Sequence, residues 1–208
     1  MRAALAILVA VLTPLAACTD NGGDPSEALF QPEHMLEISI ALAPLDWETL
    51  RNQPDRIDAP EITCASQPTE PKYTYFPAEV TIDGEIFTQV AVRKKGGFGS
   101  LSTLRPGLKV KSNEYVRGQR ILGLEQLTLN NNQQDSSLVK QCLTYPLFSS
   151  AGLPASRCSF AHVTVNGEDL GVYSHVESIK EEFLRRHFAD DSGNLYEGGA
   201  DFRPGWVN

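Results

Sequence analysis

The chain has 208 residues and a formal net charge of −8 at pH 7, because 26 acidic residues outnumber 18 basic ones. This acidic balance argues against nucleic acid as the main partner. The length allows one hydrophobic core, so we expect one domain, or one lobe of a larger domain, behind any targeting segment.

The N-terminus has the pattern of an exported lipoprotein. Arg2 supplies a positive start, residues 3–15 are apolar, and residues 15–18 (Leu-Ala-Ala-Cys) match a lipobox. A run of about 15 apolar residues is too short to span a bilayer as a helix. We therefore expect residues 1–17 to be a signal peptide and Cys18 to carry the lipid that anchors the chain to a bilayer. Residues 18–33 are expected to form a flexible tether, and the protein to lie in the cell envelope or at the cell surface.

Residues 34–208 are expected to fold. Alternating apolar residues predict a strand over 36–42, and a short helix over 44–53 and a long loop over 54–72 follow it. The Asp83-Gly84 pair predicts a hairpin over 75–95, with further strands at 107–111 and 124–130. A second hairpin is expected over 160–176, around Asn166-Gly167, and a helix over 179–188.

A longer helix is expected between the two groups of strands. Asp135 or Ser136 caps its start and Gly152 ends it, while Pro146 inside it predicts a kink. Together these elements predict an α+β fold, in which helices pack on a mostly antiparallel sheet.

Three cysteines remain once Cys18 carries lipid. Outside the cytoplasm a disulfide is expected, and the sequence leaves every pairing among Cys64, Cys142 and Cys158 open. No metal site is predicted. His162 and His175 could face each other across the second hairpin, but two histidines without a carboxylate make a weak metal site.

Two neighbouring strands carry the residues that point to phosphate binding. Side chains alternate along a strand, so Arg93 and Lys95 share one face, and the glycines from Gly96 onward allow backbone amides to approach an anion. Lys109 and Lys111 share a face of the next strand. The alternative is an ordinary glycine turn beside solvated lysines.

Two acidic residues follow further along the chain. Helix capping accounts for Asp135, and the polar run before it, residues 130–134, either lines a cleft or forms a plain loop. Glu177 stands where a strand gives way to a helix. There it could pair with a strand lysine, mark a nucleotide cleft or simply be solvated.

The order of these segments resembles the spore-coat CotH family of atypical kinases over residues 82–202. The matching segments are Lys95-Gly96, residues 105–111 (RPGLKVK), residues 127–130 (LTLN), Asp135-Ser136, Asn166-Gly167 with residues 171–173 (GVY), Glu177 and residues 194–197 (NLYE). The resemblance implies a kinase-like fold of two lobes with ATP between them, and the chain resembles the N-terminal lobe.

The resemblance also implies roles for individual residues. The ATP-binding residues would be Arg93, Lys95, Gly96, Lys109, Lys111 and Glu177. Lys109 or Lys111 would hold the phosphates, and Glu177 would lie near the hinge. The catalytic residues and the ligands of Mg²⁺ are expected beyond Asn208 in a second lobe, so the chain is expected to be an incomplete kinase domain, inactive by itself.

Two functions follow as expectations. The first is an exported Ser/Thr protein kinase that transfers phosphate from Mg-ATP to envelope or coat proteins. The second is a non-catalytic surface lipoprotein that uses the same fold as a binding or structural scaffold. An unrelated α+β lipoprotein domain is the third and plainest interpretation.

Overall fold

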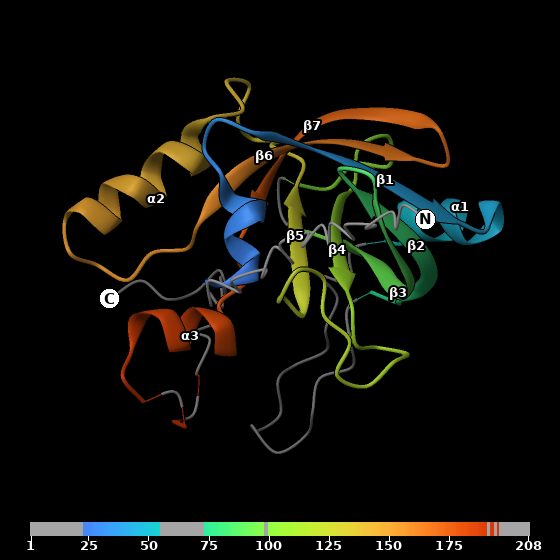
Figure 1. Ribbon diagram of the computed structural model, residues 1–208. Coiled ribbons are helices and arrows are strands. Elements are labelled where there is room, and N and C mark those ends of the chain that lie inside the picture. Colours follow the sequence, from blue (N-terminus) through green and yellow to red (C-terminus); the bar gives the residue numbers. More distant parts are fainter. Residues whose placement is uncertain (1–22, 55–72, 98–99, 191, 194, 196–208) are drawn as a thin grey trace, which may run out of the picture.

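The computed structural model describes residues 23–54, 73–97, 100–190, 192, 193 and 195. Seven strands close into a barrel in the order β1-β2-β3-β4-β5-β7-β6 (Figure 1). The strands are β1 (Met35–Leu42), β2 (Phe76–Ile82), β3 (Glu85–Lys95), β4 (Gly107–Lys111), β5 (Gln126–Asn130), β6 (Cys158–Val165) and β7 (Glu168–Val176). The helices are the 3₁₀ helix η1 (Pro25–Phe30), α1 (Pro44–Asn52), α2 (Lys140–Ser150) and α3 (Glu181–His187).

The closed barrel shows that the predicted α+β fold with helices packed on a sheet is wrong. The first strand, β1, pairs in parallel with β6, from Met35 opposite Phe160 to Ile40 opposite Val165. This long-range pairing leaves no open edge and encloses the core within the sheet itself. The helices cover little of it, and α2 buries none of its residues.

Both predicted hairpins are confirmed, and their turns explain why. Asp83 and Gly84 have φ values of 50° and 88°, and Asn166 and Gly167 have values of 51° and 82°. Two central residues with positive φ are typical of type I′ turns, whose twist matches that of the flanking strands. The two turns thereby fix the register of β2 with β3 and of β6 with β7.

The inward-facing side chains of the strands fill the barrel interior. Burial alternates residue by residue along β1, β5 and β6. The interior side chains include Leu36, Ile38, Ile40, Val80, Val92, Val110, Leu127, Leu129, Val163 and Tyr173. Trp47 and Leu50 of α1 join the same core.

The segment before β1 differs from the flexible tether that the sequence suggested. Residues 25–30 form η1. Asp24 is its N-cap residue, and the Asp24 carboxylate accepts a hydrogen bond from the backbone N–H of Ser26 at 2.9 Å. Leu29 is fully buried and Phe30 nearly so, both within the barrel core. The folded domain therefore begins earlier than expected. The predicted signal peptide and Cys18 lie outside the described residues.

Helix α2 stands outside the barrel beside β6 (Figure 1), and a disulfide joins the two. Cys142 of α2 is bonded to Cys158 of β6, with 5.1 Å between their Cα atoms. This settles the pairing that the sequence left open. Cys64 lies outside the described residues.

The two histidines of the β6–β7 hairpin do not face each other. His162 lies opposite Val172, and its ring nitrogens are each 2.9 Å from a carboxylate oxygen, of Glu37 and of Asp169. His175 points into the barrel and is fully buried.

Candidate functional site

A polar pocket of about 250 Å³ lies where β3 and β5 end and α2 begins. Six carboxamide side chains make up half of its lining. The lining residues are Asn130, Asn131, Asn132, Gln133, Gln134 and Gln141, with Lys95, Gly96, Ser100, Gly107, Asp135 and Lys140. The polar run 130–134, which the sequence assigned equally to a cleft or a loop, thus lines a pocket.

A chain of three polar side chains crosses the pocket from β3 to α2. The ammonium group of half-buried Lys95 donates a hydrogen bond to the Asn130 carbonyl oxygen. Asn130 in turn donates from Nδ2 to Oε1 of Gln141 at 2.7 Å. Burial, and then the neighbouring charge of Arg93, lowers the pKa of Lys95 below its ordinary value. Lys95 is therefore a desolvated cation that an anion in the pocket would stabilise.

The glycine turn after β3 forms one side of the pocket. Gly96 has a φ of 120°, and a Cβ atom there would lie 2.6 Å from the Ser100 hydroxyl oxygen. That hydroxyl accepts a hydrogen bond from the Gly97 N–H at 3.0 Å, and the Ser100 N–H donates to the Gly97 carbonyl at 2.9 Å. The turn therefore needs glycine at position 96 for both backbone and steric reasons.

The wall opposite the glycine turn contains Asn131 and Asn132, which make different hydrogen bonds. Buried Asn131 donates to the carbonyls of Ser100 and Arg105, at 3.0 and 2.7 Å, and so ties this wall to the glycine turn. Asn132 has a φ of 53°, and its Oδ1 accepts a hydrogen bond from Ser174 at 3.1 Å. Among the described residues, the buried Nδ2 of Asn132 meets no hydrogen-bond partner.

Asp135 holds the beginning of α2. Its carboxylate accepts hydrogen bonds from the N–H and hydroxyl of Ser137 and from the N–H of Lys140, the last at 2.9 Å. The hydrogen bond from the Ser137 hydroxyl is the largest contribution to a lowered pKa of Asp135. The predicted N-cap position is wrong, because α2 begins at Lys140 and its N-cap residue is Val139, but the Asp135 carboxylate still binds the first N–H of the helix.

The four predicted phosphate-binding cations share one face, but only one of them, Lys95, lines the pocket. Arg93 lies opposite Lys109, and Lys95 opposite Gly107, so these side chains occupy the outer surface of β3 and β4. Lys95 lines the pocket. Lys111 instead donates to a Glu114 carboxylate oxygen at 2.6 Å. The pocket residues that sequence reasoning missed include Gln141, whose only signal was its place in the first turn of the capped helix.

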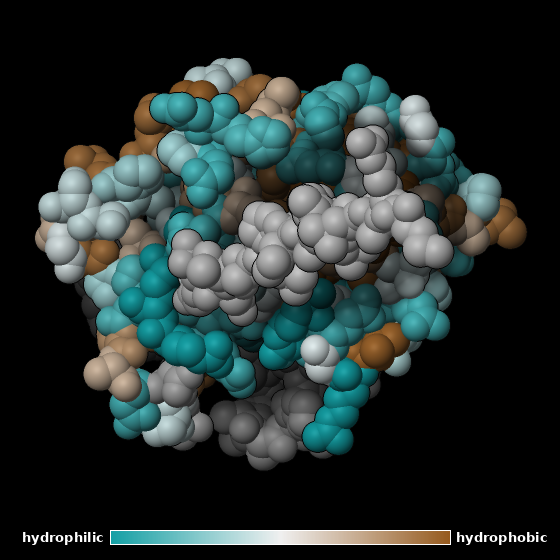
Figure 2. Space-filling model, in the orientation of Figure 1, coloured by the Kyte–Doolittle hydropathy of each residue, from teal (hydrophilic) through white to brown (hydrophobic). Residues whose placement is uncertain are grey.

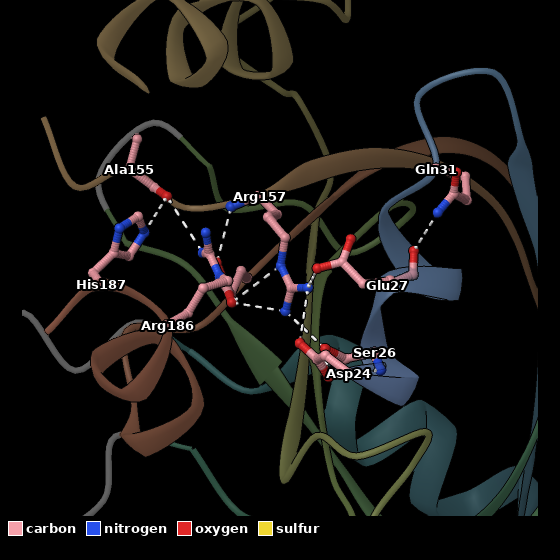
Figure 3. A network of polar contacts seen from close by, with 9 residues as sticks. Asp24, Ser26, Glu27, Gln31, Ala155, Arg157, Arg186 and His187 are labelled. Carbon is pink, nitrogen blue, oxygen red and sulfur yellow. Dashed lines mark hydrogen bonds and ion pairs between the residues drawn. The ribbon is translucent and has the colours of Figure 1, made fainter. Parts of the chain in front are cut away.

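Glu177 belongs to a separate ionic cluster around Arg157, and Figure 3 shows Arg157 beside Asp24, Glu27 and Arg186. The Glu177 carboxylate accepts hydrogen bonds from the backbone N–H of Arg157 at 3.0 Å and from two nitrogens of its guanidinium, at 3.2 and 2.9 Å, and it also pairs with Arg186. Arg157 reaches Glu27 at 2.8 Å and Asp24 at 3.2 Å. Glu177 thus links Arg157, the residue before β6, to α3, and Arg157 extends the cluster to η1. The predicted place of Glu177 near a hinge stays a prediction.

The sequence around the pocket matches a known protein family. A family model described as CotH kinase protein matches residues 92–206, more than half of the chain. The chain belongs to the CotH family. The matched region includes β4 to α3 and all of the pocket lining.

Two relatives from Bacillus subtilis (strain 168) support this membership. The chain is 33% identical to an inner spore coat protein H-like protein over 78 residues, which are 38% of this chain and 25% of that protein. It is 32% identical to inner spore coat protein H over 82 residues, 39% of this chain and 23% of that protein. Each CotH-family match thus spans about a quarter of the relative's length.

None of the helices described is long and apolar enough to cross a bilayer. Within the described part of the chain, no group of three or more His, Cys, Asp or Glu side chains is arranged to hold a metal ion.

Proposed function

We propose that the chain is part of an exported CotH-family protein kinase and that its pocket holds the phosphates of ATP. The observation that carries the proposal is Lys95, a half-buried cation beside a glycine turn in a polar pocket. The complete enzyme would transfer phosphate from Mg-ATP to Ser or Thr hydroxyls of envelope or coat proteins. The names of its relatives favour a coat-associated location.

The described residues fit the phosphates better than they fit the magnesium ion. Lys95 and Lys140 bring positive charge to the pocket. Among the described lining residues Asp135 is the one carboxylate, and both its oxygens already accept hydrogen bonds that hold α2. A magnesium site needs carboxylates that are free to coordinate, so these residues do not supply one.

Calorimetric titration of the purified chain with Mg-ATP tests the proposal. Replacing Lys95 with Met removes the desolvated cation and should weaken binding about tenfold or more, which is the effect of losing one charged hydrogen bond. Lys111→Met is the matched control, because its ammonium is already bound to Glu114. Lys109→Met tests the remaining candidate lysine. No binding by the parent chain, or equal binding by all three variants, would refute the proposed site.

A second function, a non-catalytic binding scaffold, is favoured by the six carboxamides of the pocket. A carboxamide both donates and accepts hydrogen bonds, which suits a ligand rich in hydroxyl groups, such as a glycan. A scaffold of this kind would bind neutral oligosaccharides equally well with Lys95 or with Met at that position. The same titrations, repeated with an oligosaccharide, separate the two functions.

A further inference from the structure

Helix α2 is held to the barrel by few contacts. None of its residues is buried, and Leu143 and Leu147 are about two-thirds exposed (Figure 2 shows apolar and polar side chains mixed in the region of this helix). An isolated helix of 11 residues is only marginally stable in water. The position of α2 therefore depends on its specific attachments, of which the Cys142–Cys158 disulfide is the covalent one.

The same helix completes the pocket. Lys140 and Gln141, its first two residues, line the cavity. Gln141 accepts the hydrogen bond from Asn130 Nδ2, and this interaction orients the Asn130 carbonyl oxygen toward Lys95. The disulfide partner Cys142 is the very next residue, so the bond that fixes the helix also fixes Gln141.

We propose that the Cys142–Cys158 disulfide is a redox-sensitive control on the pocket. With the disulfide formed, α2 is fixed and the hydrogen-bonded chain from Lys95 to Gln141 is complete. A dithiol reductant transfers two electrons and two protons to the disulfide, leaves two thiols on the protein and becomes a cyclic disulfide itself. Reduction then releases α2 and withdraws Gln141 from the pocket.

The disulfide is placed where a reductant can reach it. Both cysteines are half-buried rather than enclosed in the core. Thiol–disulfide exchange requires such access, and a control of this kind needs a bond that can be both reduced and reformed. The identity of the pocket ligand as ATP rests on the proposed function, whereas the release of α2 does not.

Hydrogen exchange measured by mass spectrometry tests the release of α2. The parent for this experiment carries Cys18→Ser and Cys64→Ser, so that Cys142 and Cys158 are its only thiols. Treatment with dithiothreitol should make the amides of α2 exchange about tenfold faster or more, because the helix opens locally. The double variant Cys142→Ser/Cys158→Ser should exchange at the fast rate with or without reductant. Equal protection of α2 in the oxidised and reduced parent would overturn the proposal.

The pocket is monitored by a second measurement that needs no ligand. Acetylation of Lys95, compared with that of Lys111 in the same sample, should become faster on reduction as Lys95 loses its ordered surroundings. Gln141→Ala, which keeps the disulfide, should speed the acetylation of Lys95 while α2 stays protected. Leu143→Ala, an exposed change on the same helix, should alter neither. An acetylation rate of Lys95 that does not change on reduction would refute the link between disulfide and pocket.

Titration with Mg-ATP separates this inference from the proposed function. Weaker binding by the reduced chain than by the oxidised chain supports both. If neither form binds Mg-ATP while α2 and Lys95 still respond to reductant, the nucleotide assignment fails and the redox control stands.

Discussion

Lys94 and Lys95 are consecutive residues of β3 whose ammonium groups point to opposite sides of the barrel wall. Lys94 is buried, and its Nζ donates to the carbonyls of Arg51 and Gln53, at 2.8 and 2.9 Å, where α1 ends. Lys95 donates to Asn130 in the pocket. One lysine therefore anchors a helix, while its neighbour is available to a ligand.

The different partners of Lys94 and Lys95 predict opposite effects on stability and binding when each lysine is replaced by Met. Lys94→Met leaves two helix-end carbonyls without their donor and should lower the free energy of unfolding by about 1–3 kcal/mol, with pocket binding retained. Lys95→Met removes a cation whose burial already disfavours its charge, so stability should change by less than about 1 kcal/mol while binding falls. Urea unfolding and titration of both variants check the pair, and an equal loss of stability in the two would contradict this difference.

The buried pairing of Glu177 with Arg157 predicts that replacing Glu177 will strongly lower the stability of the protein. The side chain of Glu177 is 1% exposed, and that of Arg157 is 13% exposed. Glu177→Gln removes the charge that compensates Arg157 and Arg186, so it should cost about 3–5 kcal/mol. Glu181→Gln is the control, since its pair with Arg185 is mostly exposed and should contribute less than about 1 kcal/mol. Thermal unfolding measures both, and a stable Glu177→Gln protein with impaired ATP binding would favour the hinge role instead.

Buried His175 predicts that the protein loses stability at mildly acidic pH. The ring stacks on Phe30, with centroids 4.7 Å apart, and burial lowers the pKa of His175 from 6.5 to about 4. The unfolded chain binds this proton at higher pH than the folded chain does, so stability falls as pH drops from 6.5 to about 4. The full loss from this one group is about 3 kcal/mol. His175→Leu should flatten the unfolding free energy over this window; an unchanged slope would count against the assignment.

His162 has the opposite effect on the pH dependence of stability. The hydrogen bond to Glu37 is the largest contribution to a raised pKa of His162. Its stabilising contribution is therefore complete below pH 6.5 and is lost as pH rises through the raised pKa. His162→Gln should destabilise the protein at pH 6 and have less effect at pH 9, as measured by urea unfolding at the two values. A variant that is equally destabilised at both values would show that the charge of His162 is not the cause.

The close approach of Gly96 to Ser100 predicts that a larger residue at position 96 will disturb the pocket. Gly96→Ala places a methyl group against the Ser100 hydroxyl and adds strain at a positive φ. Gly84→Ala is a useful comparison, because Gly84 also has a positive φ but its Cβ would meet no atom within 4 Å. We expect both to lose about 1 kcal/mol or more from backbone strain, and Gly96→Ala alone to disturb the pocket, observed as altered acetylation of Lys95. Unaltered acetylation of Lys95 in Gly96→Ala would contradict the packing of the turn.

The strands could be predicted from the sequence because their signals are local. Alternating burial and the Asp83-Gly84 and Asn166-Gly167 turns determine both hairpins within a few residues. Barrel closure depends instead on β1 meeting β6, and no short segment encodes which distant strand will be the partner. The prediction of helices packed on the sheet failed because α2, the longest described helix, stands outside the barrel and buries none of its residues.

The candidate site was only partly foreseeable. Lys95 and Gly96 could be found because a cation followed by glycine is a local pattern. Glu177 was assigned by its position at a strand end, but its partner Arg157 lies 20 residues away and is visible only in three dimensions. The role of Gln141 likewise arises from a contact across the pocket with Asn130.

The parallel pairing of β1 with β6 has a consequence for how the protein is made. Glu37 on β1 and His162 on β6 are neighbours although 125 residues separate them in the chain. The ribosome synthesises β1 early, yet β1 cannot acquire this partner until β6 has also emerged. During that interval β1 is an apolar strand with an unfilled edge, the kind of segment that chaperones must shield. Closure of the barrel is therefore completed late, after β7, which lies between β5 and β6 in the sheet, has also been synthesised.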